Sequence, residues 1–197
     1  MTPGVIILTA IFTSIFGGVN TLWDRRYGFM NKALTAPVSR SSIAIGKMLA
    51  ISLIAAIQSS LILGIALAIG VSFPNPWMIA PIMAIVVLFS LGFSGISVVI
   101  AATAKSQETF WGVINFLGMP LFMLSPALFP LELLPDWLAA AARLNPVTYT
   151  VLLVREMMTG VTEGVSTILS IGVITIFVAV MVGLASYVFT REVNKPF

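Results

Sequence analysis

Residues 48–104 read MLAISLIAAIQSSLILGIALAIGVSFPNPWMIAPIMAIVVLFSLGFSGISVVIAATA, a stretch without a single charged side chain. A membrane-spanning helix needs about 20 apolar residues, and a helix satisfies its own backbone polar groups in lipid. The stretch is long enough for two such helices, and FPNPW at 73–77 indicates a turn between them. It therefore predicts two spans, near residues 48–70 and 78–103.

The rest of the chain has the same character. Of its 197 residues, 59% are hydrophobic and only 9% are charged, whereas soluble domains carry roughly 25% charged residues. The charges flank the long apolar tracts instead of interrupting them. The sequence therefore predicts an all-α polytopic membrane protein, with one transmembrane domain over residues 1–197 and five spans near 4–23, 48–70, 78–103, 110–130 and 165–189.

The residue types exclude several kinds of chemistry. The chain has no cysteine and no histidine, which excludes disulfides and zinc-thiolate sites and removes the commonest general base and metal ligand. Its net charge of +3 is carried by few cations, and these flank apolar runs. Membrane topology explains such cations better than nucleic-acid binding does. We therefore expect membrane lipids around the chain, no nucleic-acid partner, and no metal site or cofactor in the chain itself.

The cations are distributed unevenly between the two sides of the predicted membrane. Cytoplasmic loops of membrane proteins carry an excess of lysine and arginine. With five spans, one side has only Arg143 and Arg155, which predicts that the N-terminus is outside and the C-terminus cytoplasmic. The other, cytoplasmic side has eight cations: Arg25, Arg26, Lys32, Arg40, Lys47, Lys105, Arg191 and Lys195.

One cytoplasmic segment, WDRRYGFMNKALTAPVSRS at 23–41, has two interpretations. It fits a stop signal for membrane insertion, with aromatic residues at the interface. It also fits a short amphipathic helix, because Tyr27, Met30 and Leu34 fall at helical spacing and Pro37 ends any helix. Such a helix can pack on the membrane surface or on a partner protein. Both interpretations stay open from the residues alone.

Several motifs occur in order along the chain. Pro3-Gly4 starts the first span, and DRRYG at 24–28 is followed by PVSR at 37–40. LPDWL at 134–138 and LNPVTY at 144–149 precede the last span. Together, over essentially the whole chain, these motifs resemble the ABC-2 type permeases, membrane subunits that export drugs, lipids or polysaccharides. The resemblance implies that a set of residues marks the two outer helices, and we call this set the outer-helix signature. Its members are Leu134, Pro135, Asn145, Pro146, Tyr149 and Arg155.

The resemblance implies a division of labour between subunits. The segment 24–40 would be a coupling helix that docks on a separate ATPase subunit, which binds ATP and magnesium. The chain itself lacks a G-x-x-x-x-G-K-[ST] phosphate loop, and its spans carry no ionisable residue of the kind that moves protons. A second permease copy, identical or different, would complete the transporter. The implied ATPase contacts are Arg25, Arg26, Tyr27, Met30 and Leu34.

Two features depart from the family pattern. The turn at 24–26 reads Asp-Arg-Arg and lacks the usual glutamate after arginine. Family members have six spans with both ends cytoplasmic, whereas this chain begins where their second span would. Either an upstream span is missing or this is a shortened member.

The fourth predicted span contains Pro120, Pro126 and Pro130, which predict a kinked or short helix. Its methionine and phenylalanine side chains offer a soft apolar surface for hydrophobic cargo, although they equally suit contact with lipid or a dimer core. After this span, residues 134–160 predict two short outer helices, broken at Asn145-Pro146. The possible cargo-facing residues are Phe116, Met119, Phe122, Met123 and Phe129.

Two other functions remain as alternatives to transport. A membrane-embedded enzyme needs a cluster of acidic groups, and Glu132 and Asp136 form the only closely spaced pair. Without a histidine partner, this pair fits solvated carboxylates at an outer helix better than a catalytic site. A structural membrane subunit is the other alternative. The sequence does not distinguish a drug cargo from a lipid or a glycan.

Overall fold

The computed structural model describes residues 2–71, 75–127, 135–161 and 165–192, without the side chains of Asn31, Ala33, Leu34, Pro76 and Phe122. Within these ranges the chain is helical and contains no strand, which confirms the predicted all-α class. The elements are α1 (Thr2–Arg26), α2 (Phe29–Thr35), α3 (Arg40–Ala68), the short 3-10 helix η1 (Pro76–Met78), α4 (Ile79–Thr103), α5 (Gln107–Met123), α6 (Asp136–Arg143), α7 (Pro146–Thr159) and α8 (Thr167–Glu192).

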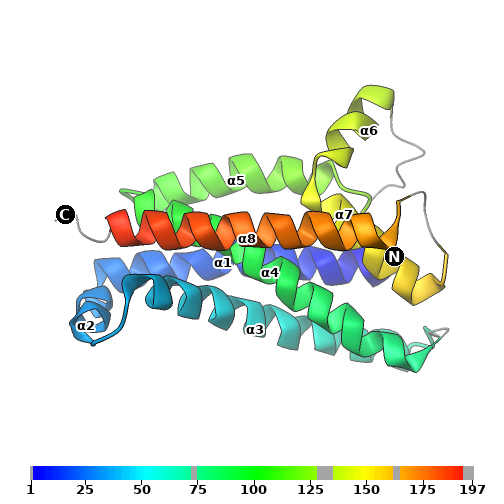
Figure 1. Ribbon diagram of the computed structural model, residues 1–197, viewed down its shortest axis with the longest axis horizontal. Coiled ribbons are helices and arrows are strands. Elements are labelled where there is room, and N and C mark those ends of the chain that lie inside the picture. The colour runs from blue at the N-terminus through cyan, green and yellow to red at the C-terminus, as the bar shows by residue number, and fades with distance from the viewer. Residues whose placement is uncertain (1, 72–74, 128–134, 162–164, 193–197) are drawn as a thin grey trace.

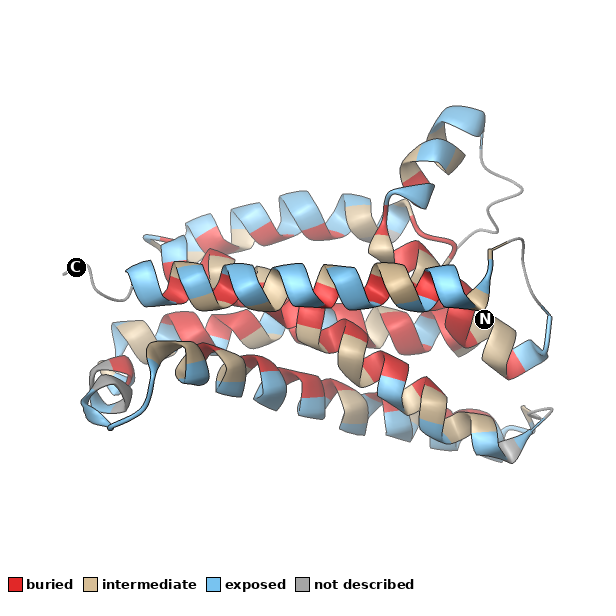
Figure 2. Ribbon diagram, in the orientation of Figure 1, coloured by how far each residue is buried: buried red, intermediate tan, exposed pale blue. Residues whose placement is uncertain are grey.

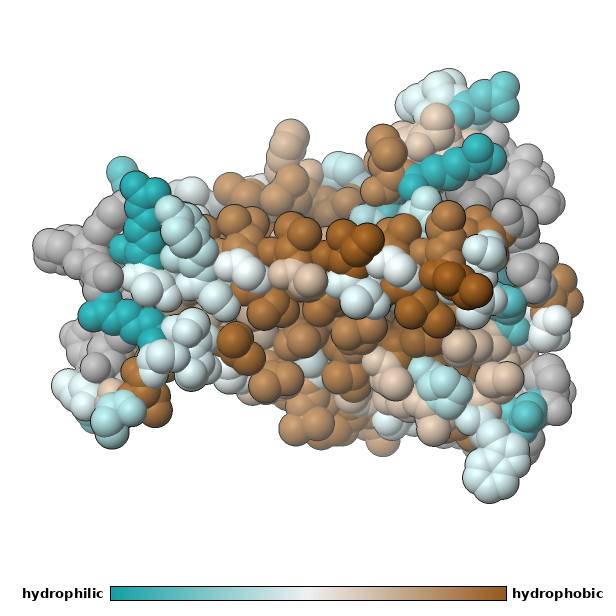
Figure 3. All heavy atoms as spheres, in the orientation of Figure 1, coloured by the Kyte–Doolittle hydropathy of each residue, from teal (hydrophilic) through white to brown (hydrophobic). Residues whose placement is uncertain are grey.

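The long helices run side by side along one axis, so the molecule has two distinct ends (Figure 1). The short helix α2 lies at one end, together with the C-terminal end of α8. The pair α6 and α7 lies at the other end, close to the N-terminus. We refer to these as the α2 end and the α7 end. Between them, one face of the molecule shows a broad apolar belt, with hydrophilic side chains towards both ends (Figure 3).

Four helices are long and apolar enough to cross a membrane: α1, α3, α4 and α8. Their bounds lie within a few residues of the spans predicted near 4–23, 78–103 and 165–189. Helices α6 and α7 meet at 87°, so this bent pair is either a fifth, broken crossing or a re-entrant segment. The chain is therefore a multi-pass membrane protein.

Helix α3 begins earlier than the predicted start at residue 48. Its first residue is Arg40, because the Ser39 hydroxyl accepts a hydrogen bond from the Ser42 backbone nitrogen at 3.2 Å and caps the helix. The helix therefore continues through Lys47 towards the α2 end. The first turns of a long helix can extend beyond the hydrocarbon and carry charged residues. A search for uncharged tracts therefore misses these turns.

Helix α5 is shorter than the span predicted at 110–130. It has 17 residues and contains Pro120, so it rises about 26 Å against a hydrocarbon core about 30 Å thick. The prediction of a short helix is thus confirmed, although α5 is not among the helices long enough to cross by themselves. Residues 128–134, with Phe129, Pro130 and Glu132, lie outside the described residues.

Helix α4 forms the centre of the bundle and packs against α1, α3 and α8. The buried positions face this centre, and the exposed ones face outward (Figure 2). The Phe89 and Phe93 rings lie 4.8 Å apart between centroids, and Phe93 lies 5.8 Å from Phe177 of α8. Tilted aromatic pairs at such distances stabilise the core by more than the area that they bury.

Small residues allow α1 and α4 to approach closely. The space where a Gly18 side chain would project is occupied by Ser97, whose backbone oxygen lies 2.8 Å from the ideal Cβ position. The Ser97 hydroxyl donates to the Ser14 carbonyl at 2.7 Å, and the Ser14 hydroxyl donates to the Ser90 carbonyl at 3.3 Å. In lipid, where water does not drive helices together, such close packing and interhelical hydrogen bonds hold the bundle.

Candidate functional site

The junction between α1 and α2 determines which side chains face outward at the α2 end. Helix α1 ends at Arg26, and Gly28 has a φ of 75°, a left-handed conformation that glycine adopts without strain. Helix α2 begins only after this turn, at Phe29. The predicted helix running from Tyr27 to Leu34 is therefore wrong at its start, because Gly28 interrupts the helical phase between Tyr27 and Met30.

Met30 is turned into the bundle. Its side chain is 4% exposed and belongs to a buried cluster with Met48 of α3, Ala102 of α4 and Phe189 of α8. This position corrects the prediction that Met30 lies at a docking surface, since the side chain already anchors α2 to three long helices. The Leu34 side chain, the other apolar contact predicted on this helix, lies outside the described residues.

Other side chains of the same segment are exposed. Tyr27 is 69% exposed and Phe29 is 60% exposed. The Lys32 ammonium lies 5.5 Å from the centroid of the Phe29 ring, within cation–π distance. Phe29 was not among the predicted contacts, because the helical phase was counted through Gly28. We define the α2 surface as Arg26, Tyr27, Phe29, Lys32 and Val38, all of which are exposed.

Arg25 does not belong to the α2 surface. Its guanidinium donates to the Ala101 carbonyl at 3.0 Å and to the Ala102 carbonyl, in the last turn of α4. The Glu192 carboxylate at the end of α8 attracts the same guanidinium. Arg25 therefore ties the end of α1 to the ends of α4 and α8, and it places a cation where the α4 dipole is negative. Its predicted role as an ATPase contact stays untested.

A second link joins α1 to α3. The Lys47 ammonium forms an ion pair with the Asp24 carboxylate, and both side chains are partly exposed. Pairs of this kind contribute at most about 1 kcal/mol. Together with Arg25 and Met30, the pair fixes where the α2 segment sits relative to the bundle.

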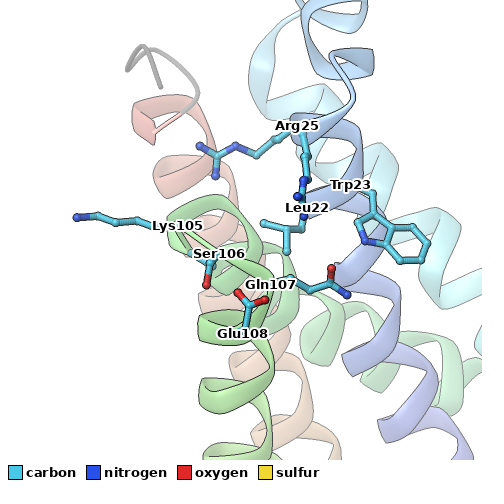
Figure 4. Close-up of a pocket in the computed structure, with 9 residues that line it drawn as sticks. Leu22, Trp23, Arg25, Lys105, Ser106, Gln107 and Glu108 are labelled. Carbon is cyan, nitrogen blue, oxygen red and sulfur yellow. The ribbon is translucent and has the colours of Figure 1, made fainter.

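A hollow of about 600 Å³ opens beside the ends of α1 and α4 (Figure 4). In the close-up, Arg25 and Trp23 extend to opposite sides, and Lys105 points outward from the link to α5. Ser106 caps α5 by accepting from the Thr109 backbone nitrogen at 3.1 Å. The hollow is lined by Leu22, Trp23, Arg25, Arg26, Ala104, Lys105, Ser106, Gln107 and Glu108.

The charges around this hollow are mixed. Arg25, Arg26 and Lys105 are its cations, and Glu108 is its anion. A hydrogen bond from the Ser106 side chain lowers the pKa of Glu108, with Arg26 contributing a weaker electrostatic effect in the same direction. The hollow therefore offers both donors and an acceptor to polar groups of a partner. Within the described residues, no group of three acidic side chains is arranged to hold a metal ion.

The apolar face of α5 is the second region singled out by the sequence. Phe116 is 78% exposed, Met119 is 61% exposed and Met123 is 54% exposed. A small apolar hollow separates this helix from α1, with Phe16 and Met119 in its wall. The geometry suits hydrophobic cargo, lipid and a second subunit alike. The Phe122 side chain and Phe129 lie outside the described residues.

The outer-helix signature has a structural role where it is described. Pro135 precedes α6, and Asn145 caps α7 by accepting from the Val147 backbone nitrogen at 3.0 Å while donating to the Leu121 carbonyl at 2.6 Å. Pro146 is the first residue of α7, and Leu134 is outside the described residues. The Tyr149 hydroxyl donates to the Arg143 carbonyl at 2.7 Å, and Arg155 donates to the Pro126 carbonyl at 2.8 Å.

These contacts give α7 a more buried position than expected. The sequence predicts a short outer helix here, yet most of the residues from Val147 to Met158 are buried. It packs against α1, α4 and α8, whereas α6 buries only Ala142. Helix α7 is thus part of the core, and α6 alone projects from it (Figure 1).

Residues 1–159 match the family described as ABC-2 type transporter. The chain belongs to the ABC-2 type transporter family. The match covers α1 and runs to the last residue of α7, so it includes the α2 surface, α5 and the outer-helix signature. Membership confirms the resemblance and assigns the chain to a class of membrane transport proteins.

Three relatives of this ABC-2 type chain are named as permeases. It is 31% identical over 150 residues to the putative transport permease ycf38 of Cyanophora paradoxa, covering 76% of this chain and 52% of that protein. It is 26% identical to the probable multidrug ABC transporter permease YbhR of Escherichia coli strain K12, covering 76% and 40%. It is 29% identical to the linearmycin resistance permease LnrN of Bacillus subtilis strain 168, covering 81% and 39%. The matches thus span about half or less of these relatives.

Proposed function

We propose that this ABC-2 type chain is a transmembrane subunit of an exporter that is driven by a separate ATPase subunit, which docks on the α2 surface. The α2 surface carries the proposal, because it presents Tyr27 and Phe29 beside the exposed cations Arg26 and Lys32 at one end of the bundle. Aromatic anchors surrounded by charged side chains are typical of protein–protein binding sites. ATP and magnesium would bind in the ATPase subunit.

The contacts at the α2 end suggest how movement would pass from the ATPase to the bundle. A push on α2 reaches α3, α4 and α8 through Met30, and reaches α4 directly from α1 through Arg25. The segment from Ala104 to Gln107 then leads from α4 into α5, whose exposed face is apolar. The proposed cargo is a hydrophobic drug, lipid or glycan, in keeping with relatives named for multidrug transport and linearmycin resistance. A second permease copy would enclose the pathway.

The docking proposal is tested by charging the α2 surface. Tyr27→Asp and Phe29→Asp, alone and together, are expected to reduce pull-down of the cognate ATPase at least about tenfold, since a central aromatic anchor contributes 2 kcal/mol or more. Leu144→Asp and Trp77→Asp serve as matched controls, because these residues are 87% and 85% exposed and lie directly after α6 and in η1, not in the α2 segment. Binding and ATP-dependent transport that survive in the double variant would reject the proposal.

The orientation is a separate proposal: the chain sits in the cell membrane with the α2 end in the cytoplasm and the N-terminus outside. Reporter fusions after Ser41 and after Asp136 are expected to report cytoplasm and exterior respectively, because cations retain loops on the cytoplasmic side. The reverse pattern would contradict it. Among the described residues, the α2 end has the cations Arg25, Arg26, Lys32, Arg40, Lys47, Lys105 and Arg191, and the α7 end has Arg143 and Arg155.

A further inference from the structure

Two hollows follow the seam between α1 and α5, one after the other. The charged hollow described above lies at the α2 end, between the last turn of α1 and the link from α4 to α5 (Figure 4). The second is the small apolar hollow further along the same two helices. Ile15 and Phe16 of α1 and Ile114 and Met119 of α5 are among its lining residues, and Asn115 adds a polar side chain.

The charged hollow lies at the depth of the lipid headgroups. About 20 residues of helix cross the hydrocarbon, and counted from Thr2 they end near Thr21 of α1. Counted from Ile79 they end near Val98 of α4. The lining residues, at 22–26 and 104–108, come after both crossings. Trp23 is exposed among them, as is usual for tryptophan at a membrane interface.

The two hollows lie within one leaflet of the bilayer. Leu22 and Phe16 are six positions apart on α1, and Glu108 and Ile114 are six positions apart on α5. Each separation corresponds to about 9 Å of helix, which is less than half of a hydrocarbon core about 30 Å thick. A phospholipid with its headgroup in the charged hollow therefore has its acyl chains at the level of the apolar hollow.

The charges of the hollow fit a headgroup that carries both signs. Arg25 already donates to two carbonyls of α4, so its charge serves to join helices. Arg26 and Lys105 are exposed cations, and Glu108 is an exposed carboxylate. Arginine and lysine bind a phosphate through charge-assisted hydrogen bonds, and a carboxylate accepts such bonds from an ammonium. A phosphate without an ammonium would only place a second negative charge near Glu108, and like charges repel.

We propose that the seam between α1 and α5 binds one phospholipid with a phosphoethanolamine headgroup. Its phosphate lies against Arg26 and Lys105, its ammonium lies against Glu108, and one acyl chain lies against Phe16 and Met119. The charged hollow, at about 600 Å³, has the size of a small-ligand site, for which the range is about 300–1,000 Å³. An amphiphile matches both hollows in their order along the seam, whereas a soluble protein can reach only the charged one.

Tryptophan fluorescence can test this site, because two of the four tryptophans lie at the seam. Trp23 lines the charged hollow, and the Trp111 ring lies 5.4 Å from the Phe16 ring. Trp77→Phe and Trp137→Phe remove the other two, which are exposed outside the seam. This variant of the full chain is placed in phosphatidylcholine vesicles. Phosphatidylethanolamine or phosphatidylglycerol, with the same brominated acyl chains, is then added in rising mole fraction, since bromine quenches a tryptophan that it contacts.

Half-maximal quenching is expected at a several-fold lower mole fraction of phosphatidylethanolamine than of phosphatidylglycerol. Glu108→Gln should abolish this difference, whereas Asp136→Asn, at an exposed carboxylate of α6, should preserve it. Arg26→Gln should shift half-maximal quenching to a several-fold higher mole fraction for both lipids. Arg40→Gln, at the start of α3 and outside the hollow, is the matched control for that loss.

Several results would overturn the proposal. Equal quenching by the two lipids, or a preference that survives Glu108→Gln, would show that Glu108 does not select the headgroup. Stronger quenching by phosphatidylglycerol would assign the hollow to an anionic lipid. Displacement of the brominated lipid by an equal concentration of soluble glycerophosphoethanolamine would assign it to a soluble phosphate ester. The measurement contains no ATPase, so failure here leaves the docking proposal standing.

Discussion

Replacing Met30 with aspartate is expected to destabilise the folded chain by several kcal/mol, because it places a carboxylate in a buried cluster of apolar side chains. The substitution should detach α2 from Met48, Ala102 and Phe189. Unfolding in a denaturing-detergent titration would then begin at a lower detergent fraction, and less folded protein would be recovered from membranes.

The neighbouring residue provides the control. Phe29→Asp changes an exposed side chain on the same short helix, so the unfolding transition should stay close to that of the unmodified chain. Met30→Leu conserves volume and should cost less than about 1.5 kcal/mol. If Met30→Asp left stability unchanged and abolished only ATPase binding, Met30 would belong to the docking surface after all.

Replacing Gly18 with alanine is expected to lower the free energy of unfolding by about 1–3 kcal/mol, the usual cost of overpacking a core. The added methyl group would lie 2.7 Å from the Ser97 Cβ and 2.8 Å from its backbone oxygen. A backbone cannot rotate away as a side chain does, so α1 and α4 must separate. Their separation also strains the hydrogen bond from Ser97 to Ser14. The same detergent titration measures the effect.

At a second glycine, the same substitution is expected to have the opposite effect on stability. Gly172 lies in α8, and nothing occupies the space where its side chain would project. Gly172→Ala should therefore leave stability unchanged or raise it by up to about 1 kcal/mol, since alanine favours a helix more than glycine does. Equal effects of Gly18→Ala and Gly172→Ala would show that the α1–α4 contact is not as close as described.

The bundle could be predicted from the sequence because membrane helices obey a simple requirement. Apolar tracts between charges gave α1, α4 and α8 to within a few residues. The same reasoning started α3 too late, because it stopped at Lys47 although the Ser39 cap lies a further two turns away. It also overestimated the length of α5, because the sequence stays hydrophobic after Met123, where the helix ends.

The candidate site was harder to predict, and one glycine explains why. Helical spacing places Tyr27, Met30 and Leu34 on one face only if a single helix runs through them. Gly28 adopts a left-handed conformation, so the residues before and after it point in unrelated directions. A glycine at this position in the sequence indicates a possible helix end. Recognising that end would have added Phe29 to the predicted contacts. The inward position of Met30 depends on α3, α4 and α8, and local spacing contains no information about them.

The hydrogen bond between Ser97 and Ser14 joins segments that a ribosome makes far apart in time. Helix α1 is the first span of this stretch to enter the bilayer, yet its packing partner α4 follows only after α3 and the connection to it. During that interval the Ser14 and Gly18 face of α1 must be tolerated by lipid or shielded by an insertion factor. The α1–α4 contact therefore forms only when residues near Ser97 have been inserted, later than the contact of α1 with α3 can form.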